Sequence, residues 1–254
     1  MSEKMITVGI GSQEKLASDV YSMVLSVGEL AKEIRPGQFI NVYSDDQAHL
    51  LPRPISICEA DIMNGTLRIV YRIAGEGTLE FSGKKAGDTI RILGPLGNGY
   101  TLKRERAILM GGGIGIPPML ELAKRLECEK TIVLGYRDEL FLNKDFEKYG
   151  KVVIATEDGS CGTKGNVLDA VRAEKVEGSV IYSCGPTPML KAVKAYAVEN
   201  GLEAQISLEE RMACGIGACL ACVCKTVDVD HHSNVHNRRV CKEGPVFNAR
   251  EVEL

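Results

Sequence analysis

Hydrophobic and polar residues alternate in short runs over the first hundred residues of the chain. Gly, Pro, Asn and Asp separate these runs, which lie at residues 6–10, 19–27, 38–44, 54–60, 66–73 and 88–93. A period of two places every second side chain on the same face of a strand, and short strands broken by turn residues are typical of all-β folds. This part of the chain therefore predicts a small antiparallel β-barrel or sandwich.

The pattern changes at Ala107, where an apolar run, a glycine turn and an amphipathic stretch follow one another through Glu127. Further apolar runs lie at residues 130–137, 151–158 and 178–185, each with a helical segment near by. One of these segments stops at Gly201, a residue that often ends a helix. Buried strands that alternate with helices predict a doubly wound parallel sheet.

From about Leu208 onward the periodic pattern is lost and a cysteine-rich tail begins, without repeats or a low-complexity linker before it. The sequence thus predicts three parts. They are an antiparallel β-barrel in residues 1–102, a doubly wound α/β domain in residues 103–207 and a small metal module in residues 208–254.

Composition narrows the possible partners of the protein. No run approaches the roughly 18 uninterrupted apolar residues that span a bilayer, and the first residues lack the apolar core of a signal peptide, so we expect a cytoplasmic protein without a membrane segment. The net charge of -3 and the scattered Lys and Arg residues argue against nucleic acid as a partner.

The nine cysteines carry the main chemical signal, because their odd number fits poorly with a complete disulfide framework. Cys214, Cys219 and Cys222 follow the spacing C-x4-C-x2-C, and Cys241 comes later in the chain. This is the spacing of a plant-type [2Fe-2S] site, in which four thiolates hold two irons. Glycines between the first two cysteines allow the backbone to wrap around such a cluster.

Zinc is the rival metal, since His231, His232 and His236 lie between the third and fourth cysteine. Structural zinc sites favour paired short knuckles, however, and only one is present, so the spacing favours iron and sulfur. We interpret the histidines as solvated residues of a polar hairpin. Cys224 would point away from Cys222 in an extended chain and is left out of the ligand set.

The glycine turn after Ala107 is a candidate phosphate-binding loop. Gly111, Gly112, Gly113 and Gly115 follow a predicted strand and precede a helix, where backbone N–H groups can meet a pyrophosphate. The match to the dinucleotide fingerprint is imperfect, and a tight turn without a ligand is the alternative.

A second loop supports a nucleotide site. Cys184, Gly185 and Pro186 follow a later strand of the same predicted sheet, and ligands of such sheets gather at the carboxyl ends of strands. Asp138 could accept a hydrogen bond from an adenosine ribose, whereas neighbouring Arg137 could hold a 2'-phosphate. The residues therefore leave NAD and NADP both open.

Five motifs, in this order, resemble the ferredoxin-NADP reductase superfamily: RPISI at residues 53–57, GEGT at 75–78, GGGIGIPP at 111–118, CGP at 184–186 and CGIGACLACVC at 214–224. More narrowly, they resemble the electron-transfer subunits of class 1B dihydroorotate dehydrogenases, over essentially the whole chain. The resemblance implies a flavin-binding barrel, an NAD-binding domain and a [2Fe-2S] domain.

The resemblance also implies residue roles. For FAD it implies the pyrophosphate and isoalloxazine contacts of Arg53, Pro54, Ile55 and Ser56, a second contacting strand with Val70, Tyr71 and Arg72, and close approach at Gly77 and Thr78. It places NAD at the glycine turn and at Cys184, with Cys184 as a small positioning residue, and it implies Cys214, Cys219, Cys222 and Cys241 as cluster ligands.

The implied partner is an FMN-containing dihydroorotate dehydrogenase catalytic subunit, with which the chain would form a heterotetramer and act as an oxidoreductase subunit without catalytic side chains of its own. We expect the partner to dock near the tail, around Glu209, Glu210 and Arg211. Two alternatives stay open: an NAD(P)H reductase subunit of the same build with another redox partner, and a zinc-stabilised interaction module.

Overall fold

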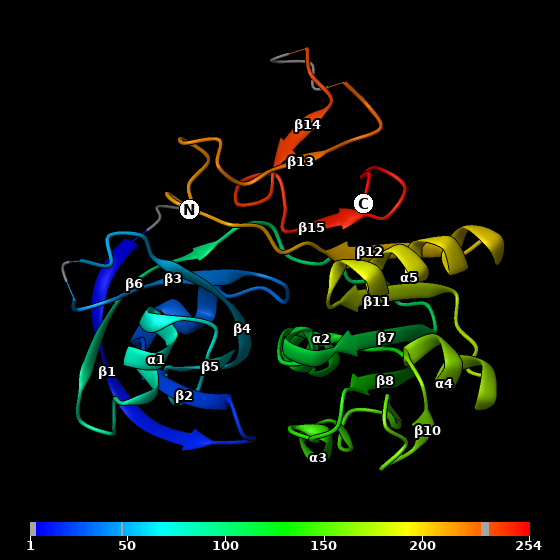
Figure 1. Cartoon of the computed structure of the whole chain (residues 1–254), viewed down its shortest axis with the longest axis horizontal. Helices are drawn as coiled ribbons and strands as arrows, with labels where there is room; N and C mark the ends of the chain where they lie inside the picture. Colours follow the sequence, from blue (N-terminus) through cyan, green and yellow to red (C-terminus); the bar gives the residue numbers. More distant parts are fainter. Residues whose placement is uncertain (1–3, 47, 230–233) are drawn as a thin grey trace.

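The computed structural model describes residues 4–46, 48–229 and 234–254. Six antiparallel strands close into a barrel in the order β1-β2-β5-β4-β3-β6 (Figure 1). They are β1 (Lys4–Lys15), β2 (Val20–Ser26), β3 (Phe39–Tyr43), β4 (Arg53–Asp61), β5 (Thr66–Arg72) and β6 (Thr89–Leu96). All six predicted runs are therefore strands, and the predicted alternative of a barrel is confirmed.

Alternation explains the barrel core. Ile90 and Ile92 of β6 point inward and are buried, whereas the alternate residues Thr89 and Arg91 are exposed. The inward residues meet those of β3 and β4, such as Ile40 and Ile57, in one apolar cluster. Two short helices that the pattern did not reveal, η1 (Gly28–Glu33) and α1 (Glu76–Ser82), follow β2 and β5.

The second part of the chain is the predicted doubly wound sheet, with the strand order β10-β9-β8-β7-β11-β12-β15. The parallel strands are β7 (Ala107–Gly112), β8 (Lys130–Tyr136), β9 (Lys151–Thr156), β10 (Thr163–Lys164), β11 (Val180–Cys184) and β12 (Glu203–Ser207). Residues of α2 (Pro118–Arg125) and α3 (Asn143–Phe146) belong to one apolar cluster. Those of α4 (Val167–Ala173) and α5 (Thr187–Glu199) belong to another, so helices cover both faces.

The cysteine-rich tail lies above both other parts (Figure 1). It contains a hairpin of β13 (Val223–Lys225) and β14 (Asn237–Arg239), followed by β15 (Val246–Asn248). β15 pairs antiparallel with β12, so the tail supplies the last strand of the central sheet. The C-terminal segment is thus built into the α/β domain, a feature that the sequence pattern did not predict.

The barrel and the α/β domain share an apolar interface. Cys58 and Val70 of the barrel lie in the same buried cluster as Ile116, Met119 and Leu120, which come from the glycine turn and α2. This interface holds the carboxyl ends of the parallel strands next to the barrel. In the part of the chain described, no helix has the length and apolar character needed to cross a membrane.

Candidate functional site

The RPISI segment forms the first half of β4, in the wall of the barrel. Arg53 donates a hydrogen bond to the carbonyl of Leu51, and its guanidinium lies directly against Gly77 of α1. A Cβ atom at Gly77 would fall 2.7 Å from the guanidinium carbon, so any larger residue would require the Arg53 side chain to move. This close approach holds a bidentate phosphate binder against the backbone at the start of α1.

Thr78 closes the loop that carries Gly77. Its hydroxyl accepts hydrogen bonds from the backbone N–H groups of Ala74 (2.8 Å) and Gly75 (3.2 Å) and donates to the carbonyl of Gly75 (3.0 Å). Thr78 is buried, so these bonds fix the turn before α1. The structure therefore brings Arg53, Gly77 and Thr78 together from two elements, as the sequence predicts.

The three predicted residues of β5 do not face the same way. The ring of Tyr71 is 1% exposed, lies inside the barrel and donates from its hydroxyl to Gln13 at 3.0 Å. Burial also raises the pKa of Tyr71. Side-chain contact between Tyr71 and a ligand outside the barrel is therefore excluded by strand alternation, which turns Val70 and Arg72 to the outer face instead.

The two predicted nucleotide loops touch one another. A Cβ atom at Gly115 would lie 2.4 Å from the carbonyl oxygen of Cys184, and one at Gly112 would lie 2.4 Å from the sulfur of Met189. These glycines let η2 (Gly113–Gly115) pack tightly on the loop between β11 and α5. Gly113 has a φ of +53° and open space around it, so its backbone is accessible.

Cys184 ends β11 beside this turn. Burial raises the pKa of its thiol to about 12, so at neutral pH it is protonated and a weak nucleophile. This state agrees with the interpretation of Cys184 as a small positioning residue. Gly185 and exposed Pro186 follow it at the start of α5.

A small cleft of about 120 Å³ lies where the carboxyl ends of β7 and β8 meet the barrel. Gly113, Asp138 and Arg72 line it together with Ser18 and Asp19 of the β1–β2 turn. Asp138 accepts from Arg137 Nε (3.0 Å) and from the backbone of Glu139 (2.8 Å). The sequence did not reveal the β1–β2 turn as part of the site, because only the fold places it there.

The four predicted ligand cysteines form two linked pairs in the tail. Cys219 lies beside Cys214 and helps to lower the pKa of the Cys214 thiol. The backbone N–H of Cys241 donates to the sulfur of Cys222 at 3.4 Å, and both cysteines are buried. Among the described residues, no group of three or more Cys, His, Asp or Glu side chains is arranged so that it could hold a metal ion.

The backbone around Cys214 suits a thiolate. The N–H groups of Ile216 (3.5 Å) and Ala218 (3.3 Å) both point at its sulfur. Burial raises the pKa of Cys214, but these hydrogen bonds and those of Cys219 outweigh it and lower the pKa to about 6. Gly215 and Gly217, with φ of +74° and +85°, permit the wrapped backbone that aims these donors.

Other candidates in the tail lie elsewhere. Cys224 is buried in β13, and burial raises its pKa to about 11. His236 contacts the carbonyl of Val227 through Nδ1 at 2.9 Å. His231 and His232 lie outside the described residues.

Asn41, which connects the barrel to the cysteine loop, was not among the residues predicted from the sequence. Its side chain is fully buried, and its amide donates to the carbonyl of Cys214 at 3.3 Å. A polar residue on the outer face of the otherwise apolar strand β3 was the available signal.

A barrel that faces the nucleotide edge of a parallel sheet is the architecture of ferredoxin-NADP reductase-like oxidoreductases. The chain superposes on an NADH-dependent reduced ferredoxin-NADP oxidoreductase, studied for flavin-based electron bifurcation, with a TM-score of 0.84 and 29% identity over 97% of this chain and 89% of that one. It also shares the fold of the ferredoxin reductase in carbazole 1,9a-dioxygenase, with a TM-score of 0.66 and 19% identity over 80% of this chain and 67% of that one.

Sequence relatives define the family within this class. Residues 209–253 match the model of the iron-sulfur cluster binding domain of dihydroorotate dehydrogenase B. The chain is 45% identical to the dihydroorotate dehydrogenase B (NAD(+)) electron transfer subunit of Fusobacterium nucleatum, over 94% of this chain and 95% of the relative. The corresponding values for the Listeria innocua subunit are 46%, 95% and 96%.

The chain therefore belongs to the family of electron transfer subunits of dihydroorotate dehydrogenase B. This result confirms the resemblance seen in the five motifs, and it confirms that the protein is an oxidoreductase subunit.

Proposed function

We propose that this chain carries electrons between NAD and an FMN-containing catalytic subunit that oxidises dihydroorotate to orotate in pyrimidine biosynthesis, with FAD and a [2Fe-2S] cluster bound to the chain itself. The observation that carries the proposal is the pairing of four cysteines within the residues that match the iron-sulfur domain of the family. In this division of labour, residues 1–102 hold FAD, residues 103–207 hold NAD and residues 208–254 hold the cluster.

The FAD site is proposed on the outer wall of the barrel. Arg53 would bind the pyrophosphate, because its guanidinium can bind phosphate oxygens in bidentate fashion and lies directly against Gly77 at the start of α1. Pro54, Ile55 and Ser56 follow on the same strand and are half-buried, which leaves surface for a flavin ring. From β5 we propose contacts by Val70, by Arg72 and by the main chain of Tyr71.

The NAD site is proposed at the carboxyl edge of the sheet. The accessible backbone of Gly113, held between Gly111, Gly112 and Gly115, would face the pyrophosphate. Cys184, Gly185 and Pro186 would line the nicotinamide end, and Asp138 would accept from the adenosine ribose.

The cluster site is proposed at Cys214, Cys219, Cys222 and Cys241. Cys214 already receives N–H donors suited to an anionic sulfur. A bound flavin converts a two-electron hydride into the single electrons that an iron-sulfur cluster carries. The chain supplies position, exclusion of water and hydrogen bonds, and the reaction requires no acid, base or nucleophile from its side chains.

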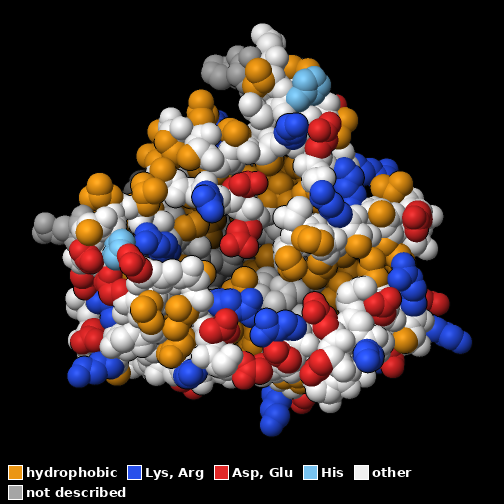
Figure 2. All heavy atoms as spheres, viewed as in Figure 1, with side chains coloured by type: hydrophobic (Ala, Val, Ile, Leu, Met, Phe, Trp, Pro, Cys, Tyr) orange, Lys and Arg blue, Asp and Glu red, His pale blue; other side chains and the backbone are white. Residues whose placement is uncertain are grey.

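We propose that the partner docks over the cysteine loop, as part of a heterotetramer. Ile216 (39% exposed) and Leu220 (60% exposed) leave apolar surface here, and Glu209, Glu210 and Arg211 are exposed beside it. Figure 2 shows hydrophobic side chains gathered on the upper part of this face. We further propose a cytoplasmic location, which is supported by nine free cysteines.

Replacement of Leu220 by glutamate is expected to weaken binding of the catalytic subunit at least about tenfold, because a carboxylate would be desolvated in an apolar contact. Titration calorimetry of the two subunits measures this affinity. Met63→Glu is the matched control, since Met63 is 93% exposed at the far barrel turn. Equal affinity of the Leu220 variant and the wild type would place the partner elsewhere.

Replacement of Asp138 by alanine is expected to lower the preference for NADH over NADPH about tenfold, measured as the ratio of kcat/KM values with an artificial acceptor. The carboxylate would otherwise accept from the 2'-hydroxyl of NADH and repel the 2'-phosphate of NADPH. Glu177→Gln removes an exposed carboxylate remote from the cleft and serves as the control. An unchanged ratio would contradict the assignment of Asp138 to the ribose.

The proposed function is tested by mixing the purified chain with an FMN-containing dihydroorotate dehydrogenase. We expect flavin and iron-sulfur absorption that bleaches with NADH, and NAD-dependent orotate production only when both chains are present. Bleaching without orotate production would favour a reductase for another partner, an alternative to which the structural likeness to a ferredoxin-NADP oxidoreductase lends support. A colourless protein that contains zinc would contradict the proposal.

A further inference from the structure

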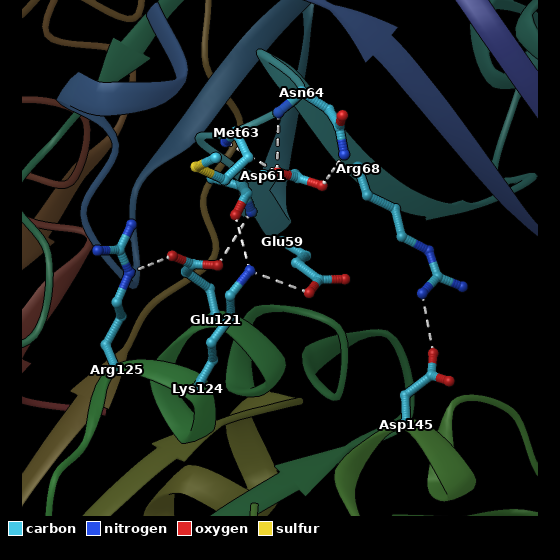
Figure 3. Close-up of polar contacts among 10 residues, drawn as sticks. Glu59, Asp61, Met63, Asn64, Arg68, Glu121, Lys124, Arg125 and Asp145 are labelled. Carbon is cyan, nitrogen blue, oxygen red and sulfur yellow. Dashed lines mark hydrogen bonds and ion pairs between the residues drawn. The ribbon is translucent and has the colours of Figure 1, made fainter. Parts of the chain in front are cut away.

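Two side chains of α2 form hydrogen bonds with the backbone N–H and carbonyl of Ala60, a barrel residue on β4. Glu121 Oε2 accepts a hydrogen bond from the backbone N–H of Ala60 at 2.9 Å. Lys124 Nζ donates to the carbonyl of Ala60 at 2.8 Å and to Glu59 Oε1 at 3.1 Å. Figure 3 shows these contacts from α2 converging on the end of β4.

Glu121 is the buried member of this group. Its side chain is 0% exposed, and its second oxygen, Oε1, accepts from Arg125 Nε at 2.7 Å. A carboxylate enclosed in an apolar interface is costly unless donors satisfy both of its oxygens. Here one donor comes from the barrel and the other from α2, so the carboxylate is fully satisfied only when the two parts are in register.

A more exposed contact joins the same two parts further along the interface. Arg68 of β5 donates to Asp145 of α3 at 2.8 Å. The backbone N–H of Ser18 in the β1–β2 turn also donates to Glu139 Oε2 at 2.9 Å. Between these polar contacts lies an apolar cluster that includes Cys58, Val70 and Met119. Apolar surfaces are non-directional, whereas hydrogen bonds to a buried carboxylate fix one relative position of the two elements.

Both elements joined by Glu121 lead into the proposed cofactor sites. β4 carries Arg53 to Ser56 upstream of Ala60, about 13 Å from Ser56 at the usual rise of a strand. α2 begins three residues after Gly115, and Glu121 lies one turn into it. The contact therefore connects the strand proposed for FAD to the helix that follows the turn proposed for NAD.

We propose that Glu121 is a positioning residue that fixes the flavin strand against the nucleotide turn and thereby sets the geometry of hydride transfer between NADH and FAD. This inference rests on the proposed function. In the transfer a hydride, which is two electrons and one proton, leaves NADH to give NAD+ and joins the oxidised flavin. Such transfers need reacting atoms about 3–3.5 Å apart, and a displacement of about 1 Å costs about 100-fold in rate.

The test uses the full FAD-loaded chain and stopped-flow measurement of flavin reduction by saturating NADH, expressed per bound flavin. Glu121→Leu removes both acceptors and keeps the apolar volume; we expect reduction about 10- to 100-fold slower, with the Kd for NADH within about twofold of wild type. Glu121→Gln retains a carbonyl acceptor for Ala60, and we expect it to restore the rate to within about threefold. Hydrogen exchange of the Ala60 amide should be at least about tenfold faster in the leucine variant.

These measurements separate positioning from folding, because a merely structural role would reduce the yield of loaded protein and leave the rate per flavin unchanged. Arg106→Gln, which removes two exposed ion pairs of the α/β domain, with Glu129 and Glu177, is the matched control and should transfer hydride at the wild-type rate. If Glu121→Leu does not fold, Lys124→Met, which removes the donor to the Ala60 carbonyl from a partly exposed position, should slow the transfer about threefold or more.

A wild-type rate in the leucine variant, or in Lys124→Met when the former is unfolded, would overturn the inference. Absence of flavin reduction in the wild type would instead contradict the proposed function.

Discussion

Cys219→Ala is expected to abolish the iron-sulfur absorption of the purified chain and to reduce electron transfer to the FMN-containing subunit more than about 100-fold. A [2Fe-2S] cluster is held by four thiolates, and this variant retains only three of them. Cys219 is exposed, so its replacement leaves no cavity in a core. NADH oxidation with an artificial flavin acceptor should stay within about threefold, because that route does not include the cluster.

Cys224→Ala provides the matched control for this prediction. This variant removes the buried thiol of Cys224, which lies in β13 two residues after Cys222. All four proposed ligands stay in place. We expect the control to retain its iron content, its visible spectrum and its transfer to the partner. Equal loss of dye reduction and partner reduction in Cys219→Ala would contradict the proposed order of carriers.

Gly77→Val is expected to lower the FAD content of the purified chain at least about tenfold. A Cβ atom at this position would fall 2.7 Å from the guanidinium of Arg53, so a branched side chain must push Arg53 out of place. FAD would then lose the bidentate contact of Arg53 with its pyrophosphate and the close approach to the backbone. This loss weakens FAD binding and lowers the FAD content. Flavin released by heat and measured by fluorescence, per mole of protein, gives the content directly.

Gly83→Ala controls for the loss of a glycine at the other end of the same helix. Its φ of -84° suits any residue, and an added Cβ atom would meet the nearest atom at an ordinary 3.4 Å. We expect full FAD content in this variant. If Gly77→Val also retained its flavin, the assignment of the pyrophosphate to Arg53 would be wrong.

The strands were predictable because their signal is local. Each barrel strand has its own alternation, and each sheet strand is an apolar run, so neither needs knowledge of its neighbours. α1 was not foreseen, because its seven residues begin in a glycine-containing turn and show too little helical periodicity. β15 was not foreseen either, because a three-residue edge strand is recognised only by its partner β12.

The residues of the candidate site divide in the same way, into those with a local sequence signal and those that depend on distant neighbours. Cysteine spacing and the two glycine loops could be read from short segments of sequence. The inward direction of Tyr71, the contact of Asn41 with Cys214 and the bond of Glu121 to Ala60 depend on which strands and helices become neighbours. Pairs such as Asn41 and Cys214 are more than a hundred residues apart in sequence, so no local pattern connects them.

The position of β15 in the central sheet has a consequence for biosynthesis. The strand begins five residues after Cys241, so it leaves the ribosome only after all four cysteines have been made. Because domains fold as units during synthesis, the nucleotide domain can be completed only after all four cysteines have been made.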